Sequence, residues 1–245
     1  DFLIADATVQ IKSRLNNFKD LELIVCSVAS LRGLGVKQIN LYVPYVLGAR
    51  SDRKFEDGGN NYLKDVICPL INSLGLDSVT VLDPHSDCLE MGLKNFIKID
   101  NRYFVKWAIS QINNTRDNIS LCSPDSGALK KIYYVGDFLG LKGDVISCSK
   151  SRENDGRLSK TVVPEFDVTN DIVIIDDICD GGQTFINIAK EILGRECEGK
   201  IYLFVTHGIF SKGFGELQQY FEAIYTTNSF QDIQAEPFVK QLNVF

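Results

Sequence analysis

Several features that would assign this chain to a common class are missing from it. Lys, Arg, Asp or Glu interrupts every apolar run well before the thickness of a bilayer, which excludes a transmembrane helix. The chain begins without a basic segment followed by an apolar one, so we see no signal peptide. It also begins without Met, which leaves room for further N-terminal sequence. We therefore expect a cytoplasmic protein with no membrane partner.

Basic charge and histidine are also scarce. The net charge of -6 argues against a nucleic-acid binder, which normally carries a basic face. A nucleotide substrate remains compatible, because a few Lys and Arg with a divalent cation can gather phosphates. His85 and His207 are the only histidines. The seven cysteines are odd in number and never spaced C-x-x-C, which is typical of reduced cytosolic thiols in a core, not of disulfides or a zinc ribbon.

What the sequence does contain is an alternation of strand and helix signals. We expect strands near 38–43, 78–82, 119–122, 172–175 and 201–205, and helices near 21–31, 62–74, 103–112 and 185–193. Strands separated by single helices imply βαβ units and a mainly parallel sheet. The strands are too many for one small sheet, so we predict two α/β domains, residues 1–102 and 103–245. The polar segment from Ser147 to Leu158 is predicted to be a mobile loop.

The most informative segment is IVIIDDICDGGQT at 172–184. A buried strand runs into Asp176 and Asp177 and then into a glycine turn at the start of a helix. Ligands of parallel sheets sit beyond the carboxyl ends of the strands. Paired carboxylates can accept hydrogen bonds from sugar hydroxyls, and a helix N-terminus can bind phosphate. This combination suits a sugar phosphate as ligand. One alternative is a simple Asp-capped helix. A Walker-B strand is the other, but no G-x-x-x-x-G-K-[ST] loop occurs in the chain to accompany it.

This segment resembles the phosphoribosyl-diphosphate (PRPP) loop of type I phosphoribosyltransferases and PRPP synthetases. Four further segments resemble PRPP synthetases in particular: VPYVLGARSDRK at 43–54, LDPH at 82–85, SPDSGALK at 123–130 and VTHG at 205–208. They occur in the family's order, from about Glu22 to Asn228. The resemblance implies two phosphoribosyltransferase-like domains, each with a mainly parallel sheet flanked by helices. It also implies a homo-oligomer, a dimer or a dimer-based hexamer.

For the N-terminal domain the resemblance implies a site for ATP and metal. Arg50 matches the family's ATP-binding arginine, with Asp52 to orient it and Arg53 beside it. Without the resemblance this run is equally a solvated loop. His85 matches the histidine that holds the Mg²⁺ bound to ATP, although such a histidine is more often packed or capping. Asp83 would then act through water or through His85.

For the C-terminal domain the resemblance implies a ribose-phosphate site. Asp176 and Asp177 would hold the ribose hydroxyls, and the following turn would hold the 5-phosphate. That turn consists of Asp180, Gly181, Gly182, Gln183 and Thr184. Asp125 matches an acid near a second divalent cation, and it also suits a helix N-cap. Lys150 and Arg152 match residues that close over the reacting phosphates, the alternative being an exposed charge pair. For His207 we favour a structural role.

The chain departs from the family in three places. The family's turn commonly has Asp-Thr-Gly-Gly-Thr, so a hydroxyl donor is lost at Gly181 and a bulky amide replaces glycine at Gln183. A phosphodiester carries less charge than a terminal phosphate and needs space, so this turn suits a ribose-5-phosphate unit with something attached, such as ADP-ribose. A phage-borne branch of the family is associated with rebuilding NAD⁺ from it. Between Ile11 and Asp20 there is also no room for the family's extra strand and loop, and Ser51 replaces a glutamine near the adenine.

We therefore expect a diphosphotransferase that uses Mg²⁺ and takes ATP as co-substrate. The acceptor would be either ribose 5-phosphate, which would give PRPP, or ADP-ribose, which would serve NAD⁺ salvage. The sequence supports these two acceptors almost equally. The alternatives are a phosphoribosyltransferase, which would not need the Arg50 and His85 segments, and a non-catalytic regulatory paralogue of PRPP synthetase.

Overall fold

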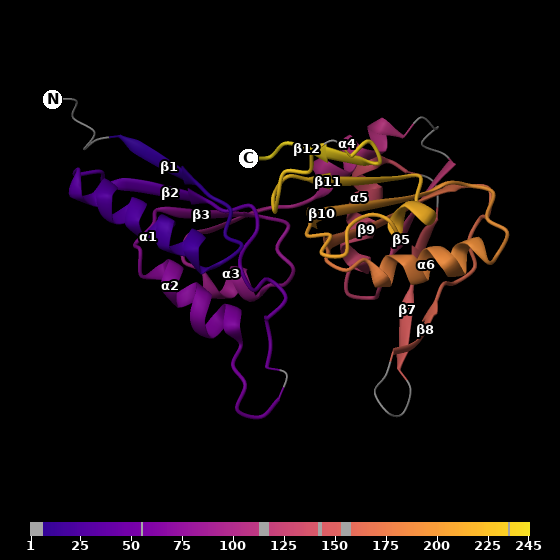
Figure 1. Ribbon diagram of the computed structural model, residues 1–245, viewed down its shortest axis with the longest axis horizontal. Coiled ribbons are helices and arrows are strands. Elements are labelled where there is room, and N and C mark those ends of the chain that lie inside the picture. Colours follow the sequence, from indigo (N-terminus) through magenta and orange to yellow (C-terminus); the bar gives the residue numbers. More distant parts are fainter. Residues whose placement is uncertain (1–6, 55, 113–117, 142–143, 153–157, 235) are drawn as a thin grey trace. The chain divides into compact units, whose positions relative to one another are not determined.

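The chain folds as two compact units, Asp1–Asn101 with Val244–Phe245, and Arg102–Asn243 (Figure 1). The computed structural model describes residues 7–54, 56–112, 118–141, 144–152, 158–234 and 236–245, without the side chains of residues 150–160. We call the two parts unit 1 and unit 2 and describe each by itself.

Unit 1 contains a four-stranded parallel sheet in the order β1-β2-β3-β4. Its strands are β1 (Thr8–Lys12), β2 (Gln38–Tyr42), β3 (Ser78–Leu82) and β4 (Phe96–Ile99). Its helices are α1 (Phe18–Gly33), the π-helical turn η1 (Leu63–Ile67), α2 (Cys68–Asn72) and α3 (Cys88–Gly92). All of them pack on one face, where alternate strand residues such as Ile39, Leu41 and Val81 join a single core (Figure 1).

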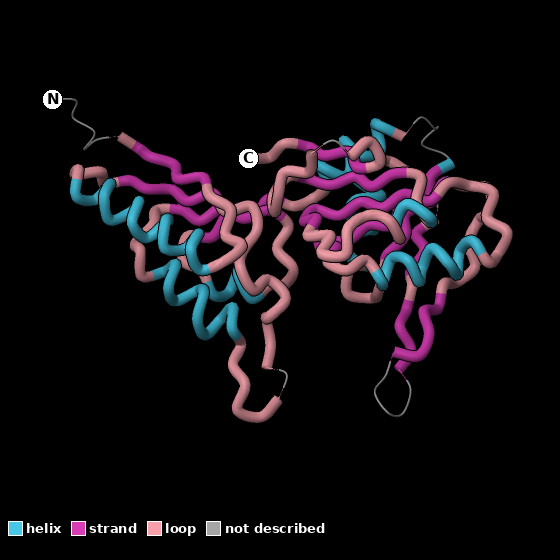
Figure 2. The backbone as a smooth tube through the Cα atoms, in the orientation of Figure 1, coloured by secondary structure: helices cyan, strands magenta, loops and turns pink. Residues whose placement is uncertain are grey.

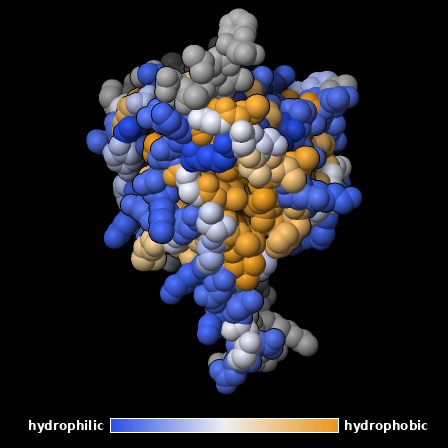
Figure 3. Space-filling view, turned by 90° about the vertical axis from the view of Figure 1, so that its left-hand side faces the viewer, coloured by the Kyte–Doolittle hydropathy of each residue, from blue (hydrophilic) through white to orange (hydrophobic). Residues whose placement is uncertain are grey.

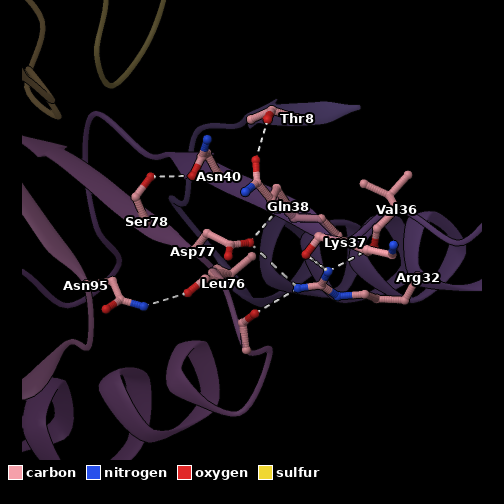
Figure 4. Close-up of polar contacts among 12 residues, drawn as sticks. Thr8, Arg32, Val36, Lys37, Gln38, Asn40, Leu76, Asp77, Ser78 and Asn95 are labelled. Carbon is pink, nitrogen blue, oxygen red and sulfur yellow. Dashed lines mark hydrogen bonds and ion pairs between the residues drawn. The ribbon is translucent and has the colours of Figure 1, made fainter. Parts of the chain in front are cut away.

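The opposite face of this sheet is polar, because the residues between the core positions point there. Thr8 donates a hydrogen bond to the amide oxygen of Gln38 (2.6 Å), and Ser78 donates one to that of Asn40 (2.7 Å; Figure 4). These cross-strand pairs replace the apolar contacts found on the helical side. Seen from the side of unit 1, apolar residues gather in the middle of the surface with hydrophilic residues around them (Figure 3).

Helix α1 begins at Phe18, three residues earlier than the sequence pattern indicated. Asn17 and Asp20 form a capping box: Asn17 accepts from the backbone N–H of Asp20 (3.2 Å), and Asp20 accepts from that of Asn17 (3.1 Å). At the other end, the Arg32 guanidinium donates to the carbonyls of Val36 (2.9 Å) and Gly75 (2.9 Å; Figure 4). This arginine ties α1 to the entries of β2 and β3, at the edge of the sheet away from the candidate site loops.

Unit 2 contains a six-stranded parallel sheet in the order β12-β11-β10-β9-β5-β6. Its strands are β5 (Ile119–Ser123), β6 (Val145–Ser147), β9 (Asp171–Cys179), β10 (Ile201–Gly208), β11 (Ala223–Thr227) and β12 (Val239–Leu242). Helices α4 (Arg102–Gln111) and α5 (Leu129–Leu139) cover one face and α6 (Gln183–Leu193) the other, with the 3₁₀ turn η3 (Leu217–Gln219) near the start of α6 (Figure 1).

Burial on both faces explains the unbroken apolar run in β9. Val173 and Ile175 pack in the core beneath α4 and α5, whereas Ile172 and Ile174 pack in the core beneath α6. Because neither face meets water, the run shows no polar alternation. The predicted architecture, α/β with mainly parallel sheets flanked by helices, is confirmed. No helix among the residues that the structure describes could cross a membrane.

The mobile loop predicted from Ser147 to Leu158 is replaced by strands at both ends of that range, and residues 153–157 lie outside the described residues. Ser147 ends β6, and the chain continues into an antiparallel hairpin of β7 (Ser149–Arg152) and β8 (Leu158–Val162), which extends away from the main sheet (Figure 2). Main-chain hydrogen bonds hold such a pair together without an apolar face. The polar side chains therefore concealed the strands from the sequence pattern.

Candidate active site

The paired aspartates lie where the central strand of unit 2 reaches the carboxyl edge of the sheet. Strand β9 is flanked by β10 and β5, so three strand ends meet there. Asp177 is buried, and Asp176 is half-buried and accepts a hydrogen bond from the Asp177 backbone N–H (3.0 Å). Burial, and then the neighbouring Asp177 carboxylate, holds the pKa of Asp176 well above its usual range, and Asp125 adds to the effect. Hydroxyl donors or a cation from a ligand would relieve this crowding of negative charge.

The glycine turn after β9 forms the N-terminus of α6. Gly182 has a φ of +79° and caps the helix, and its carbonyl accepts from the backbone N–H groups of Phe185 (3.0 Å) and Ile186 (3.1 Å). The N–H groups of Gln183 and Thr184, which open the helix, have no carbonyl one turn earlier to bind. Such an end attracts an anion through its free N–H groups and the helix dipole. The predicted 5-phosphate residues therefore lie together in one turn.

The amide of Gln183 does not fill this turn. It is exposed, and its Nε2 donates to Oδ1 of Asn187 (2.9 Å), one helical turn further along α6. This contact draws the side chain along the outer surface of the helix. The bulk that the sequence places at position 183 thus leaves the N-terminus of α6 accessible.

Lys212 is a residue of this turn that the sequence analysis missed. Its Cε, Cδ and Cγ lie 3.4, 3.5 and 3.9 Å from the position that a Cβ on Gly181 would take. It follows β10 by four residues in an otherwise unremarkable loop, and nothing in its local sequence connects it with residues 180–184. Only the parallel pairing of β9 with β10 brings the two loops together.

Asp125 follows β5, the other neighbour of β9. One of its oxygens, Oδ1, accepts from the backbone N–H of Gly127 (3.0 Å) and of Ala128 (3.3 Å), just ahead of α5. Asp125 thus closes the turn before α5, but the N-cap of this helix is Ala128, without a side-chain cap, so the predicted N-cap role of Asp125 was wrong. The carboxylate also acts on the pKa of Asp176, so the acid lies within electrostatic range of the paired aspartates.

Lys150 and Arg152 belong to β7, and only their backbone is described; their side chains lie outside the described residues. The approach to this hairpin is anchored at the same sheet edge. The backbone N–H of Cys148 donates to the carbonyl of Ser123 (2.9 Å), two residues ahead of Asp125. The hairpin therefore starts next to the strand that leads to Asp125.

The predicted ATP residues of unit 1 follow β2 and β3, which are neighbours in the sheet. Arg50, Arg53 and His85 are exposed and Asp52 is half-buried. Asn61, which the sequence analysis missed, connects these two loops. Its Nδ2 donates to the Asp52 carbonyl and also contacts Sγ of Cys88 (3.8 Å), three residues after His85.

Asp83 differs from the other acids of unit 1. It is fully buried, and its φ of +38° lies in the left-handed region that non-glycine residues rarely adopt. Its backbone N–H donates to the carbonyl of Ile99 at the end of β4 (2.7 Å). This strained turn directs the chain from β3 towards His85, which supports a positioning role for Asp83.

The donor atoms in unit 2 suit Mg²⁺. Asp125, Asp176 and Asp177 offer carboxylate oxygens, which hard cations prefer. Within the described parts of the chain, no three His, Cys, Asp or Glu side chains stand close enough together to hold a metal ion by themselves. Mg²⁺ usually binds through one or two carboxylates and completes its shell with water and substrate phosphates, so this sparse set fits it.

His207 is buried in β10, and its Nδ1 lies 2.8 Å from Oγ of Ser229. The buried Ser229 also donates to the carbonyl of Thr206 (3.1 Å). These contacts tie the end of β10 to the segment after β11, which agrees with the structural role predicted for the histidine.

The fold and the site define a class: a two-unit α/β protein with paired aspartates and a glycine turn, followed by a helix N-terminus, at the end of a central parallel strand. The crystal structure of phosphoribosylpyrophosphate synthetase from Mycobacterium smegmatis has this fold, with a TM-score of 0.84 and 18% identity over 100% of this chain and 80% of that one. No protein-family model matches the chain.

Among known proteins, the chain is 28% identical to the ribose-phosphate pyrophosphokinases of Mycoplasmopsis pulmonis, over 94% of its length, and of Maricaulis maris, over 83%. The chain is thus similar to the ribose-phosphate pyrophosphokinases at about that identity. The chain spans 70% and 64% of the lengths of these two relatives, and 54% of the Saccharolobus solfataricus one. Their names refer to ribose phosphate, and none mentions ADP-ribose.

Proposed function

We propose that this protein transfers the β,γ-pyrophosphate of ATP to the anomeric hydroxyl of a ribose-5-phosphate unit. The hydroxyl oxygen forms a bond to the β-phosphorus, the bond from that phosphorus to the bridging α,β-oxygen breaks, AMP leaves and the hydroxyl proton passes to solvent. One observation carries this proposal: Asp176 and Asp177 stand beside an anion-binding helix N-terminus at the same strand end. That pairing matches a sugar with vicinal hydroxyls and a 5-phosphate.

In unit 2, the two aspartates would accept hydrogen bonds from the ribose hydroxyls and leave O1 free to react. The raised pKa of Asp176 reflects charge that a hydroxyl donor or cation would offset. The turn from Asp180 to Thr184 would hold the 5-phosphate through its backbone N–H groups. Asp125, already oriented by two backbone N–H groups, would present its other oxygen to a metal ion.

In unit 1, Arg50, Asp52 and Arg53 would bind ATP, and His85 would hold its Mg²⁺. Histidine is an unusual ligand for this cation, so water and phosphate oxygens would supply most of the coordination. When bound, Mg²⁺ neutralises charge on the triphosphate during transfer. Asn61, which connects the Asp52 and Cys88 loops, would keep the two halves of this site in register.

Lys150 and Arg152 would stabilise the charge that builds on the transferred group, the usual task of cations in phosphoryl transfer. Replacing Lys150 with Ala should lower kcat by orders of magnitude and leave the Kd for ATP nearly unchanged. Equal losses in turnover and in ATP affinity would contradict the role. Lys130, a lysine exposed on α5, provides the matched control.

The acceptor is either ribose 5-phosphate or ADP-ribose. The names of the relatives favour the first. The outward course of Gln183 favours the second, because it leaves space at the start of α6 for a group attached to the phosphate. Replacing Gly181 with Thr together with Gln183 with Gly should then shift the preference towards ribose 5-phosphate. An unchanged ratio of kcat/KM values would remove the argument from the turn.

Mass spectrometry of the products decides between these acceptors. Purified protein would be incubated with Mg·ATP and either ribose 5-phosphate or ADP-ribose. AMP with PRPP would establish a PRPP synthetase activity, and AMP with a diphosphorylated ADP-ribose would place the protein in NAD⁺ salvage. Folded protein that yields AMP with neither acceptor would contradict the proposal and favour a non-catalytic regulatory paralogue, or a phosphoribosyltransferase if it consumes PRPP.

A further inference from the structure

The segment that carries Lys212 is fastened directly to the glycine turn of unit 2. The Cys179 carbonyl accepts from the backbone N–H groups of Ile209 (2.9 Å) and Phe210 (3.1 Å), and the Asp180 carbonyl accepts from that of Ser211 (3.2 Å). The position of Lys212 relative to the turn is therefore set by three main-chain hydrogen bonds in succession. Its approach to Gly181 is a consequence of this attachment and not of a chance side-chain conformation.

The backbone around Lys212 is itself a tight turn. Phe210 has a φ of +48° and Gly213 a φ of +69°, and the Gly213 N–H donates to the Phe210 carbonyl (2.8 Å). The Phe210 ring lies against Phe214, with centroids 4.9 Å apart, and belongs to the core beneath α6. A turn held by the buried Phe210 ring and the half-buried Phe214 ring presents Lys212 from a packed base.

Gly181 shows what the lysine stem does. Its φ is outside the left-handed region, unlike that of Gly182, so the backbone at position 181 does not require glycine. The space in front of its Cα is instead taken by Cγ, Cδ and Cε of Lys212. A branched side chain at 181 would have to displace this stem, whereas glycine allows the stem to cross the turn.

The ammonium group is one bond beyond Cε, so it must lie near the turn as well. Among the residues that the structure describes, Lys212 has no hydrogen bond or ion pair, and its side chain is exposed. A cation on a flexible stem next to the free N–H groups of Gln183 and Thr184 adds a full positive charge to a turn whose other donors are neutral N–H and hydroxyl groups.

We propose that Lys212 binds the phosphate of the acceptor and so determines the affinity of unit 2 for phosphorylated sugars. This inference rests on the proposed function, since the turn must be the acceptor's phosphate site. The lysine stem takes the place of a side chain at position 181, and its ammonium supplies the charged contact. The protein should therefore depend on Lys212 for the acceptor and not for ATP.

The first test compares two substitutions of exposed lysines in unit 2. Lys212→Met keeps the length of the stem and removes the charge, whereas Lys200→Met removes a charge that is paired with Glu222 (Nζ–Oε1 2.8 Å). Lys212→Met should raise the acceptor KM about tenfold or more, as loss of one charge-assisted hydrogen bond does, with the KM for ATP unchanged. Lys200→Met should change neither. An unchanged acceptor KM, or equal rises for acceptor and ATP, would overturn the proposal.

Calorimetry makes the test independent of turnover. Ribose 5-phosphate and ADP-ribose would be titrated into wild-type protein and into Lys212→Met. If wild type binds one of them but converts neither, the proposed function fails while the lysine's role can still be measured. At least a tenfold weaker Kd in the variant supports the role, and equal Kd values, or no binding to wild type, overturn it.

A double-mutant cycle tests whether the lysine acts across Gly181. Gly181→Val should displace the stem and weaken acceptor binding in wild type, but it should cost much less in Lys212→Ala, where no stem is left to displace. Gly181→Ala is the control, because a Cβ there meets the stem at ordinary contact distance. Circular dichroism would verify that each variant is folded. Additive effects of the two substitutions would refute the coupling.

Discussion

Two adjacent glycines in the turn of unit 2 should respond to the same substitution in opposite ways. Gly182 has a φ of +79°, and a Cβ there would lie 3.1 Å from Cδ2 of Leu217. Gly181 has an ordinary φ, and a Cβ there would meet only the flexible stem of Lys212 at 3.4 Å. We predict that Gly182→Ala destabilises unit 2 and that Gly181→Ala does not.

The magnitude follows from two contributions. Holding alanine in the left-handed region costs about 1–2 kcal/mol. Crowding against the buried Leu217 adds up to about 1 kcal/mol, because that side chain must move by a few tenths of an ångström. Both variants gain the same stabilisation, of about 0.4–1 kcal/mol, from a less flexible unfolded chain. This gain cancels when they are compared, so the difference in unfolding free energy should be about 1–3 kcal/mol.

The assay is urea unfolding followed by tryptophan fluorescence. Trp107 is the only tryptophan of the chain, and it packs edge-on against Tyr225 inside unit 2 (centroids 5.9 Å apart), so its emission reports on that unit. The midpoint should fall for Gly182→Ala and stay level or rise for Gly181→Ala, with equal m-values. Equal midpoints for the two variants would refute the reasoning, since they differ only in backbone conformation and local space.

Two further predictions concern unit 2. Asp176→Asn should abolish transfer and yet stabilise the fold at neutral pH. Burial, and then the neighbouring Asp177, raises the pKa of Asp176 in the folded state. The folded state therefore loses stability as the pH rises above about 3.9, the ordinary pKa of an aspartate. Thermal unfolding should show a gain at pH 7 that vanishes near pH 3, and a gain that is independent of pH would contradict this. Gly199→Ala should cost about 1–3 kcal/mol or more, because its Cβ would fall 1.9 Å from the Asn170 carbonyl oxygen, whereas Gly215→Ala, in open space, should be neutral in the same urea assay.

Local sequence predicted the elements whose environment leaves a periodic trace. The run at 172–175 is β-branched and apolar because β9 is buried on both faces. The segment that follows it is amphipathic because α6 buries only one of its sides. The pattern failed for β7 and β8, whose polar residues carry no such trace, and for β11, although all five of its residues are buried. It also missed β1, β4, β6 and β12, which lie at the sheet edges. Edge strands bury less, so their composition is less constrained.

Some residues of the candidate site could likewise be identified from the sequence, and others only from the structure. The aspartates at 176 and 177 and the glycine turn are contiguous in sequence, so a single segment is enough to identify them. The sequence by itself therefore determined the fold class, the strand-to-helix turn and the similarity to the pyrophosphokinases. Only the tertiary structure decided that Lys212 crosses Gly181, that Gln183 turns towards Asn187 and that Asp125 acts on Asp176. The contacts of Lys212 and Asp125 join residues from different strand ends, and strand pairing across the sheet, which no local pattern encodes, brings them together. Gln183 and Asn187 are instead one turn apart on α6.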